Sequence, residues 1–132
     1  MENVKLTILV VDDCSVMRFV VQRTIKMCGF DQAKMIEANN GKEALKILET
    51  HTVDLIIADI NMPVMGGIEM IEHLKETSAT SNIPIITVST ESNQPRVDLI
   101  TEMSTSFIHK PFSPELLRDK LLKLLEKKAI NI

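Results

Sequence analysis

Short apolar runs of strand length recur along this chain and alternate with stretches of helical periodicity. The run from Leu55 to Ala58 is continuous and partly β-branched, which is typical of a strand buried on both faces. Similar strand-like segments fall at residues 6–11, 34–38, 83–88 and 106–109. Parallel strands need helical crossovers between them, and those helices cover both faces of the sheet. The pattern therefore predicts a single α/β domain with a parallel sheet between two layers of helices.

The stretches between these runs carry apolar residues at the spacing of amphipathic helices. We expect the first helix to begin with Ser15 as its N-cap and to end at Gly29, because glycine favours the left-handed backbone after a helix. A second helix is expected from Asn40 or Gly41, and a third after the turn at residues 62–67. These three helices would connect the first four strands.

The apolar patterns that predict the last two helices differ in clarity. Pro95 can open a fourth helix at its first position, but the apolar pattern there is weak, so a short and mobile helix is expected. The fifth should run from Pro114 to about Lys128. On a helical wheel its apolar face holds Leu117, Leu121, Leu124 and Leu125. Leu116 and Leu122 fall outside that face and are left for solvent or a partner.

Composition excludes several classes of protein. The 132 residues fit one domain spanning 1–132, and a net charge of −3 gives no basic surface for nucleic acid. The apolar run near the N-terminus is too short for a signal peptide or a membrane span. Only a tail follows Lys128, so no output domain is expected. We therefore expect a monomeric cytoplasmic protein with no membrane or nucleic-acid partner.

Polar side chains stand where four of the predicted strands end. Asp12 and Asp13 follow the first strand, Asp59 the third, Ser89 the fourth and Lys110 the fifth. In open parallel sheets, ligands bind beyond the carboxyl ends of the strands, so these groups are expected to share one crevice. One strand-end aspartate alone could simply cap the next helix. Three acids, a hydroxyl and a lysine have no common capping role.

This set of side chains favours phosphoryl chemistry. Three clustered carboxylates need a cation, and hard oxygen ligands that leave room for water and phosphate suit Mg²⁺. Lys110 and Ser89 could then neutralise and hydrogen-bond the oxygens of a phosphoryl group. An Asp59 oxygen would remain free for in-line attack, giving an aspartyl phosphate. We expect the protein to catalyse only its own phosphorylation and dephosphorylation.

Four motifs together resemble the receiver domains of two-component response regulators, above all the stand-alone chemotaxis type. They are VVDDCSVMR, DINMPVMGG, VST and FIHKPF, and the resemblance covers nearly the whole chain. It implies a doubly wound, flavodoxin-like (βα)5 fold with strand order 2-1-3-4-5. It also implies phosphotransfer from a histidine kinase to Asp59, with Mg²⁺ held by Asp13, Asp59 and the main-chain carbonyl of Asn61, and with help from Asp12.

The resemblance further implies a switch and a lifetime. Ser89 and Phe107 would move on phosphorylation and alter the face formed by the fourth helix, the fifth strand and the fifth helix, where an effector docks. Phe107 lacks the hydroxyl that a tyrosine would offer there. Asn61 and Glu91 match the positions that tune dephosphorylation and the approach of a phosphatase. An aspartyl phosphate lasting seconds to minutes is therefore expected.

Some residues depart from the family pattern, and other functions remain open. The usual Gly-Ala pair before the fifth strand is replaced by residues 102–106, and the segment after Ser89 is about one residue short. A haloacid-dehalogenase-like phosphatase would need an acid where this chain has Asn61. A phosphorelay intermediate or phosphate sink outside chemotaxis remains an alternative, as does a module that binds partners without phosphorylation.

Overall fold

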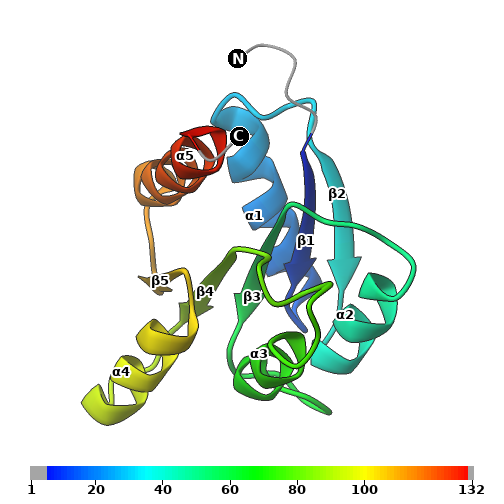
Figure 1. Cartoon of the computed structure of the whole chain (residues 1–132). Coiled ribbons are helices and arrows are strands. Elements are labelled where there is room, and N and C mark those ends of the chain that lie inside the picture. The colour runs from blue at the N-terminus through cyan, green and yellow to red at the C-terminus, as the bar shows by residue number, and fades with distance from the viewer. Residues whose placement is uncertain (1–5, 131–132) are drawn as a thin grey trace.

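The computed structural model describes residues 6–130, with side chains as far as residue 124 (Figure 1). Within that range five strands alternate with five helices. The strands are β1 (Thr7–Val11), β2 (Lys34–Ala38), β3 (Leu55–Asp59), β4 (Ile85–Ser89) and β5 (Ser106–His109). The helices are α1 (Ser15–Met27), α2 (Gly41–Leu48), α3 (Gly67–Leu74), α4 (Gln94–Met103) and α5 (Pro114–Ile130). No helix in this described part is long and apolar enough to span a membrane.

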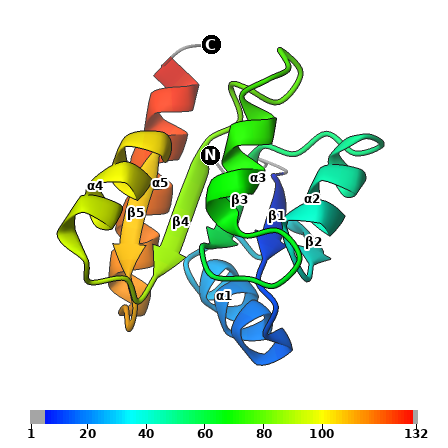
Figure 2. The ribbon, with the colours of Figure 1, turned by 90° about the horizontal axis from the view of Figure 1, so that it is seen from below.

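The strands form one parallel sheet in the order β2-β1-β3-β4-β5, which confirms the expected flavodoxin-like topology (Figure 2). β1, β3 and β4 are buried along almost their whole length, as their continuous apolar runs predict. Val11 pairs with Ala58 across the central strands. Asp12 follows Val11 and Asp59 follows Ala58, so the two aspartates lie side by side at this end of the sheet.

Helices cover both faces of the sheet. On one face Val21 and Ile25 of α1 pack with Leu117 and Leu121 of α5 against alternate residues of the strands. On the other face α2 and α3 supply the buried side chains Ala44, Met70, Ile71 and Leu74. The helix α4 contributes a single buried residue, Ile100. Met103, near the end of the same helix, is partly buried against the core on the α2 and α3 face.

The helix boundaries correct two expectations and bear out others. Ser15 is the first residue of α1, and Cys14 occupies the N-cap position without a side-chain hydrogen bond, so the predicted cap at Ser15 is wrong. Gly29 has the left-handed backbone expected after α1, with φ 101°. Asn40 caps α2 by accepting a hydrogen bond from the Glu43 main-chain N–H. Pro95 lies in the first turn of α4, one position later than predicted, because the helix begins at Gln94 behind an Asn93 cap.

The leucines of α5 lie as the helical wheel predicts. Leu117 and Leu121 are buried, and Leu124 packs against the same core. Leu116 and Leu122 are 38% and 37% exposed. The side chain of Leu125 lies outside the described part. The helix itself runs to Ile130, two residues beyond the predicted end.

Side-chain hydrogen bonds of Ser104 and Thr105 fix residues 102–106, the segment that stands in place of the Gly-Ala pair. The Thr105 hydroxyl accepts a hydrogen bond from the Ile85 main-chain N–H at 2.9 Å and so begins the pairing of β5 with β4. Ser104 donates to the Ile100 carbonyl oxygen at 2.6 Å, and its hydroxyl lies 2.8 Å from that of Thr87. Polar bonds thus connect the end of α4 to the middle of β4.

Candidate functional site

The three aspartates predicted to lie together do so. Asp12, Asp13 and Asp59 each offer a carboxylate oxygen, and these oxygens lie within 4.8 Å of one another. The Asp12 side chain is 8% exposed and that of Asp59 is 12% exposed, whereas Asp13 is open to solvent. Among the described residues this is the one such group of three or more acidic, histidine or cysteine side chains.

Lys110 reaches this cluster from the end of the edge strand β5. Its Nζ lies 3.5 Å from Asp59 Oδ1 and 3.6 Å from Asp12 Oδ2. The Lys110 main-chain N–H donates to the Ser89 carbonyl oxygen at 2.8 Å, which continues the pairing of β4 with β5 beyond His109. The following peptide bond, Lys110–Pro111, is cis. One ammonium therefore serves two partly buried carboxylates.

The electrostatic balance at Asp59 favours a cation. Burial raises the pKa of Asp59, the nearby Lys110 charge lowers it, and Asp12 raises it again, with a net rise above the ordinary value of 3.8. The donors are all hard oxygens, and the exposed Asp13 leaves space for water ligands. These are the conditions that Mg²⁺ prefers.

Main-chain contacts fix the first of these acids. Asp12 Oδ1 accepts a hydrogen bond from the Cys14 N–H at 2.9 Å, which turns the chain before α1 without capping that helix. Arg18 donates from Nη1 to the Asp12 carbonyl oxygen at 2.6 Å and from Nε to Glu37 at 2.8 Å. The sequence pattern places Arg18 within a motif but indicates no role for it. Its position one helical turn into α1 is the signal that could have found it.

Ser89 is fully buried at the end of β4, next to the lysine strand. Its Oγ accepts a hydrogen bond from the Glu91 main-chain N–H at 3.0 Å. Phe107 lies three residues before Lys110 on β5 and is partly buried. Asn61 is exposed on the loop after β3. The predicted site residues therefore form two groups. Asp12, Asp13, Asp59 and Lys110 form one charged cluster, and Ser89, Phe107 and Asn61 lie on neighbouring segments.

Gly67 brings the start of α3 against the back of the site. Its N–H donates to the Ile60 carbonyl oxygen at 2.9 Å. A Cβ added there would lie 2.6 Å from the Asp59 carbonyl oxygen and 3.0 Å from Ile60 Cα. Only glycine allows α3 to begin this close to the strand that carries Asp59.

The chain is similar to proteins of two-component signalling over almost its full length. It is 35% identical over 122 residues to a chemotaxis protein CheY homolog of Campylobacter jejuni, covering 89% of this chain and 91% of that protein. It is 34% identical over 125 residues to the autoinducer 1 sensor kinase/phosphatase LuxN of Vibrio campbellii. That match covers 95% of this chain and 14% of LuxN.

Solved structures agree with this similarity. The chemotaxis response regulator CheY4 of Vibrio cholerae matches with a TM-score of 0.80 and 30% identity, covering 91% of this chain and 98% of that one. The receiver domain of the sensor histidine kinase PA1611 of Pseudomonas aeruginosa, which has a magnesium ion in its active-site cleft, matches with a TM-score of 0.76. At 21% identity, with 94% of this chain and 97% of that one covered, it supports the fold.

The family model for the response regulator receiver domain matches residues 8–122. That range contains every strand of the sheet, the three aspartates and the lysine. The chain therefore belongs to the response regulator receiver domain family.

Proposed function

We propose that this chain is a phosphorylation-dependent response regulator in which Asp59 accepts a phosphoryl group from a histidine kinase. The observation that carries the proposal is the Lys110 ammonium 3.5 Å from Asp59 Oδ1, inside a cluster of three carboxylates. Receiver domains pair with histidine kinases and are not conventional enzymes. The expected substrate is therefore a phosphohistidine on a partner protein.

The chemistry is an in-line transfer followed by hydrolysis. An Asp59 carboxylate oxygen attacks phosphorus, the N–P bond of the phosphohistidine breaks, and the released imidazole takes a proton from solvent. Lys110 balances charge on the transferred group, and the Ser89 hydroxyl can donate a hydrogen bond to it. Water then attacks phosphorus and breaks the Asp59 O–P bond, which returns the carboxylate and releases inorganic phosphate.

The donor set fits a bound Mg²⁺, for which we assign Asp12, Asp13, Asp59 and the main-chain carbonyl of Asn61 as ligands. When bound, the ion supplies positive charge for the phosphoryl oxygens in a site with more acids than bases. The magnesium ion in the PA1611 receiver structure supports this assignment. The raised pKa of Asp59 supports it too, because a cation removes the cost of ionising a partly buried carboxyl.

Output is proposed to pass through protein binding. Ser89 and Phe107 would adjust to the phosphoryl group and change the face made by α4, β5 and α5. Leu116 and Leu122 are partly exposed on α5 and would lie on or beside that face. Asn61 and Glu91, on the loops around the site, would set the phosphoryl lifetime and the approach of any phosphatase.

The relatives support two pathways, of which we propose chemotaxis, with a phosphorelay or phosphate sink as the alternative. Similarity to CheY proteins favours a cytoplasmic, monomeric chemotaxis regulator, whereas similarity to LuxN favours a phosphorelay intermediate or phosphate sink. Affinity capture with beryllofluoride-loaded protein against an Asp59→Asn control separates them by the partner found. A partner retained equally by both forms would instead indicate a phosphorylation-independent module.

The decisive experiment is phosphorylation of the purified protein by acetyl phosphate, followed by intact mass and peptide mapping. We expect one added phosphoryl group on Asp59, dependent on Mg²⁺, absent after chelation and absent in Asp59→Asn. After removal of the donor, the group should be lost within seconds to minutes. Phosphate on another residue, or persistence for many hours, would contradict the proposal.

A further inference from the structure

Glu91 follows Ser89 by two residues and is held by one main-chain contact and two contacts of its carboxylate. Its main-chain N–H donates to Ser89 Oγ at 3.0 Å. Its Oε1 lies 2.7 Å from Arg96 Nε, and its Oε2 accepts a hydrogen bond from the Asn93 N–H at 3.2 Å. The Glu91 side chain is only 21% exposed as a result. Both carboxylate oxygens are therefore occupied on the side of α4.

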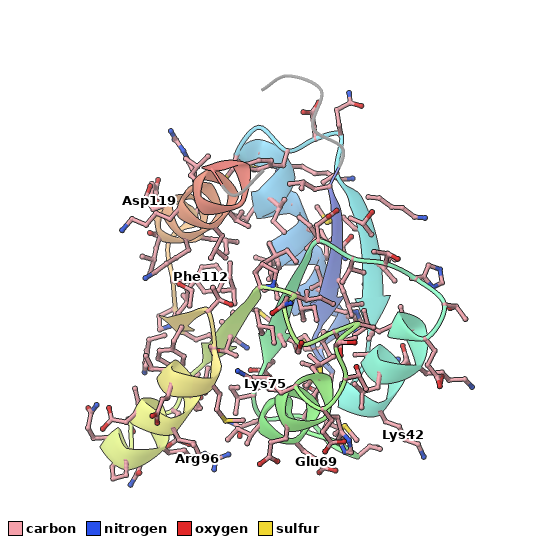
Figure 3. The ribbon with its side chains drawn as sticks, in the orientation of Figure 1. Lys42, Glu69, Lys75, Arg96, Phe112 and Asp119 are labelled. Atoms are coloured by element: carbon pink, nitrogen blue, oxygen red, sulfur yellow. The ribbon has the colours of Figure 1, made fainter. Side chains whose placement is uncertain are left out.

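The partner of Glu91 is built into the start of α4. Arg96 lies in the first turn of that helix, and its main-chain N–H donates to the Asn93 side chain that caps the helix. Figure 3 labels Arg96 on α4, at the end of the molecule toward which the strands run. The ion pair spans five residues and joins a loop to a helix. It is therefore outside the three- and four-residue pairings that a helix makes by itself.

The charge of the site explains why such a pair matters. Asp12, Asp13 and Asp59 outnumber Lys110, whose ammonium lies within 4 Å of the Asp12 and Asp59 carboxylates. Arg18 contacts only the main-chain carbonyl of Asp12 and pairs with Glu37. A phosphoryl group and its small-molecule donor are anions. If the Glu91 carboxylate, two residues from Ser89, were left unpaired, it would be a fourth negative charge and would repel both the phosphoryl group and its donor. Charges near a partly buried site are less screened than charges in bulk water.

We propose that Arg96 is a positioning residue for phosphorylation: it holds the Glu91 carboxylate against α4 and neutralises it, which keeps the Ser89 side of the site open to an anionic donor. This inference rests on the proposed phosphorylation of Asp59. It also means that the position of α4 affects the charge at the site, because Arg96 moves with that helix.

The test is the initial rate of phosphorylation by acetyl phosphate, measured before hydrolysis of the product contributes. Arg96→Gln should slow the reaction about threefold, the effect expected of one exposed ion pair, and the defect should shrink at high salt. Arg96→Lys should recover part of the rate. The double variant Glu91→Gln with Arg96→Gln should recover it fully, because the unpaired carboxylate is then gone.

The matched control is Arg118→Gln, an identical charge change at an exposed position of α5 close to Cys28. It should leave the rate unchanged. If the double variant stays as slow as Arg96→Gln, or if high salt does not reduce the defect, Arg96 acts only through the fold and the inference fails. Failure of the wild-type protein to become phosphorylated on Asp59 would instead overturn the proposed function.

Discussion

At the residue scale, Asp59 carries a charge in a place that disfavours one. Burial and Asp12 raise its pKa more than Lys110 lowers it. A raised folded-state pKa means that the folded protein binds this proton more tightly than the unfolded chain does. The stabilising contribution is full below the unfolded value of 3.8 and is lost as pH rises through the folded pKa. Near neutral pH, ionised Asp59 therefore lowers the free energy of unfolding.

Asp59→Asn should consequently stabilise the protein near neutral pH without divalent cations, by about 1 kcal/mol, because stabilising substitutions at functional sites commonly reach this size. The gain should shrink as pH falls toward 3.8, where the wild-type carboxyl binds its proton. Urea unfolding in the presence of a chelator measures it. Asp119→Asn on α5, labelled in Figure 3, is the matched control and should change little. A loss of stability in Asp59→Asn would refute the electrostatic account.

At the element scale, α1 presents an apolar surface beside the acid cluster. Val16 is 65% exposed and Phe19 62% exposed in the first two turns, directly after Asp13. Met27, at the opposite end of the helix, is 74% exposed. Exposed apolar side chains grouped next to a reactive site are typical of a protein interface. In the proposed reaction, a kinase domain that delivers a phosphohistidine to Asp59 would contact this edge.

Phe19→Gln should therefore slow phosphotransfer from a histidine kinase about tenfold, the effect of losing one well-packed aromatic contact. Phosphorylation by acetyl phosphate should not change, since this donor needs no protein interface. Met27→Gln serves as the control, because it removes a still more exposed apolar side chain at the opposite end of α1. Equal effects of the two substitutions on kinase transfer would exclude a contact local to the start of α1.

The start of α3 offers a second test at this scale. Gly67→Ala places a Cβ against the Asp59 carbonyl oxygen, so either β3 or α3 must shift. We expect a loss of about 1–3 kcal/mol in the free energy of unfolding, together with weaker Mg²⁺ binding in a titration. Gly29→Ala strains a left-handed residue that has no neighbour within 4 Å of the added Cβ. It should reduce stability and leave Mg²⁺ affinity intact; weaker Mg²⁺ binding in both variants would show a non-local effect.

At the scale of the whole molecule, the parts that could be predicted from sequence are those with local causes. Continuous apolar runs located the strands, and the strand-end rule brought Asp12, Asp59 and Lys110 together. The strand order came from the family resemblance, because periodicity carries no information about which strands are neighbours. Arg18 and Arg96 were missed for a related reason. Their partners are a strand-end carbonyl and a loop carboxylate, which only the folded chain brings within reach.

The order β2-β1-β3-β4-β5 also has a consequence for the nascent chain on the ribosome. Once β1, β2 and β3 have paired, each later strand adds beside the one made just before it. The acids are then in place early, whereas Lys110 follows β5, an edge strand and the last strand within the described part of the chain. A nascent chain that ends before β5 therefore lacks the ammonium that lies beside Asp12 and Asp59. In the proposed reaction, such a nascent chain could not yet take up a phosphoryl group.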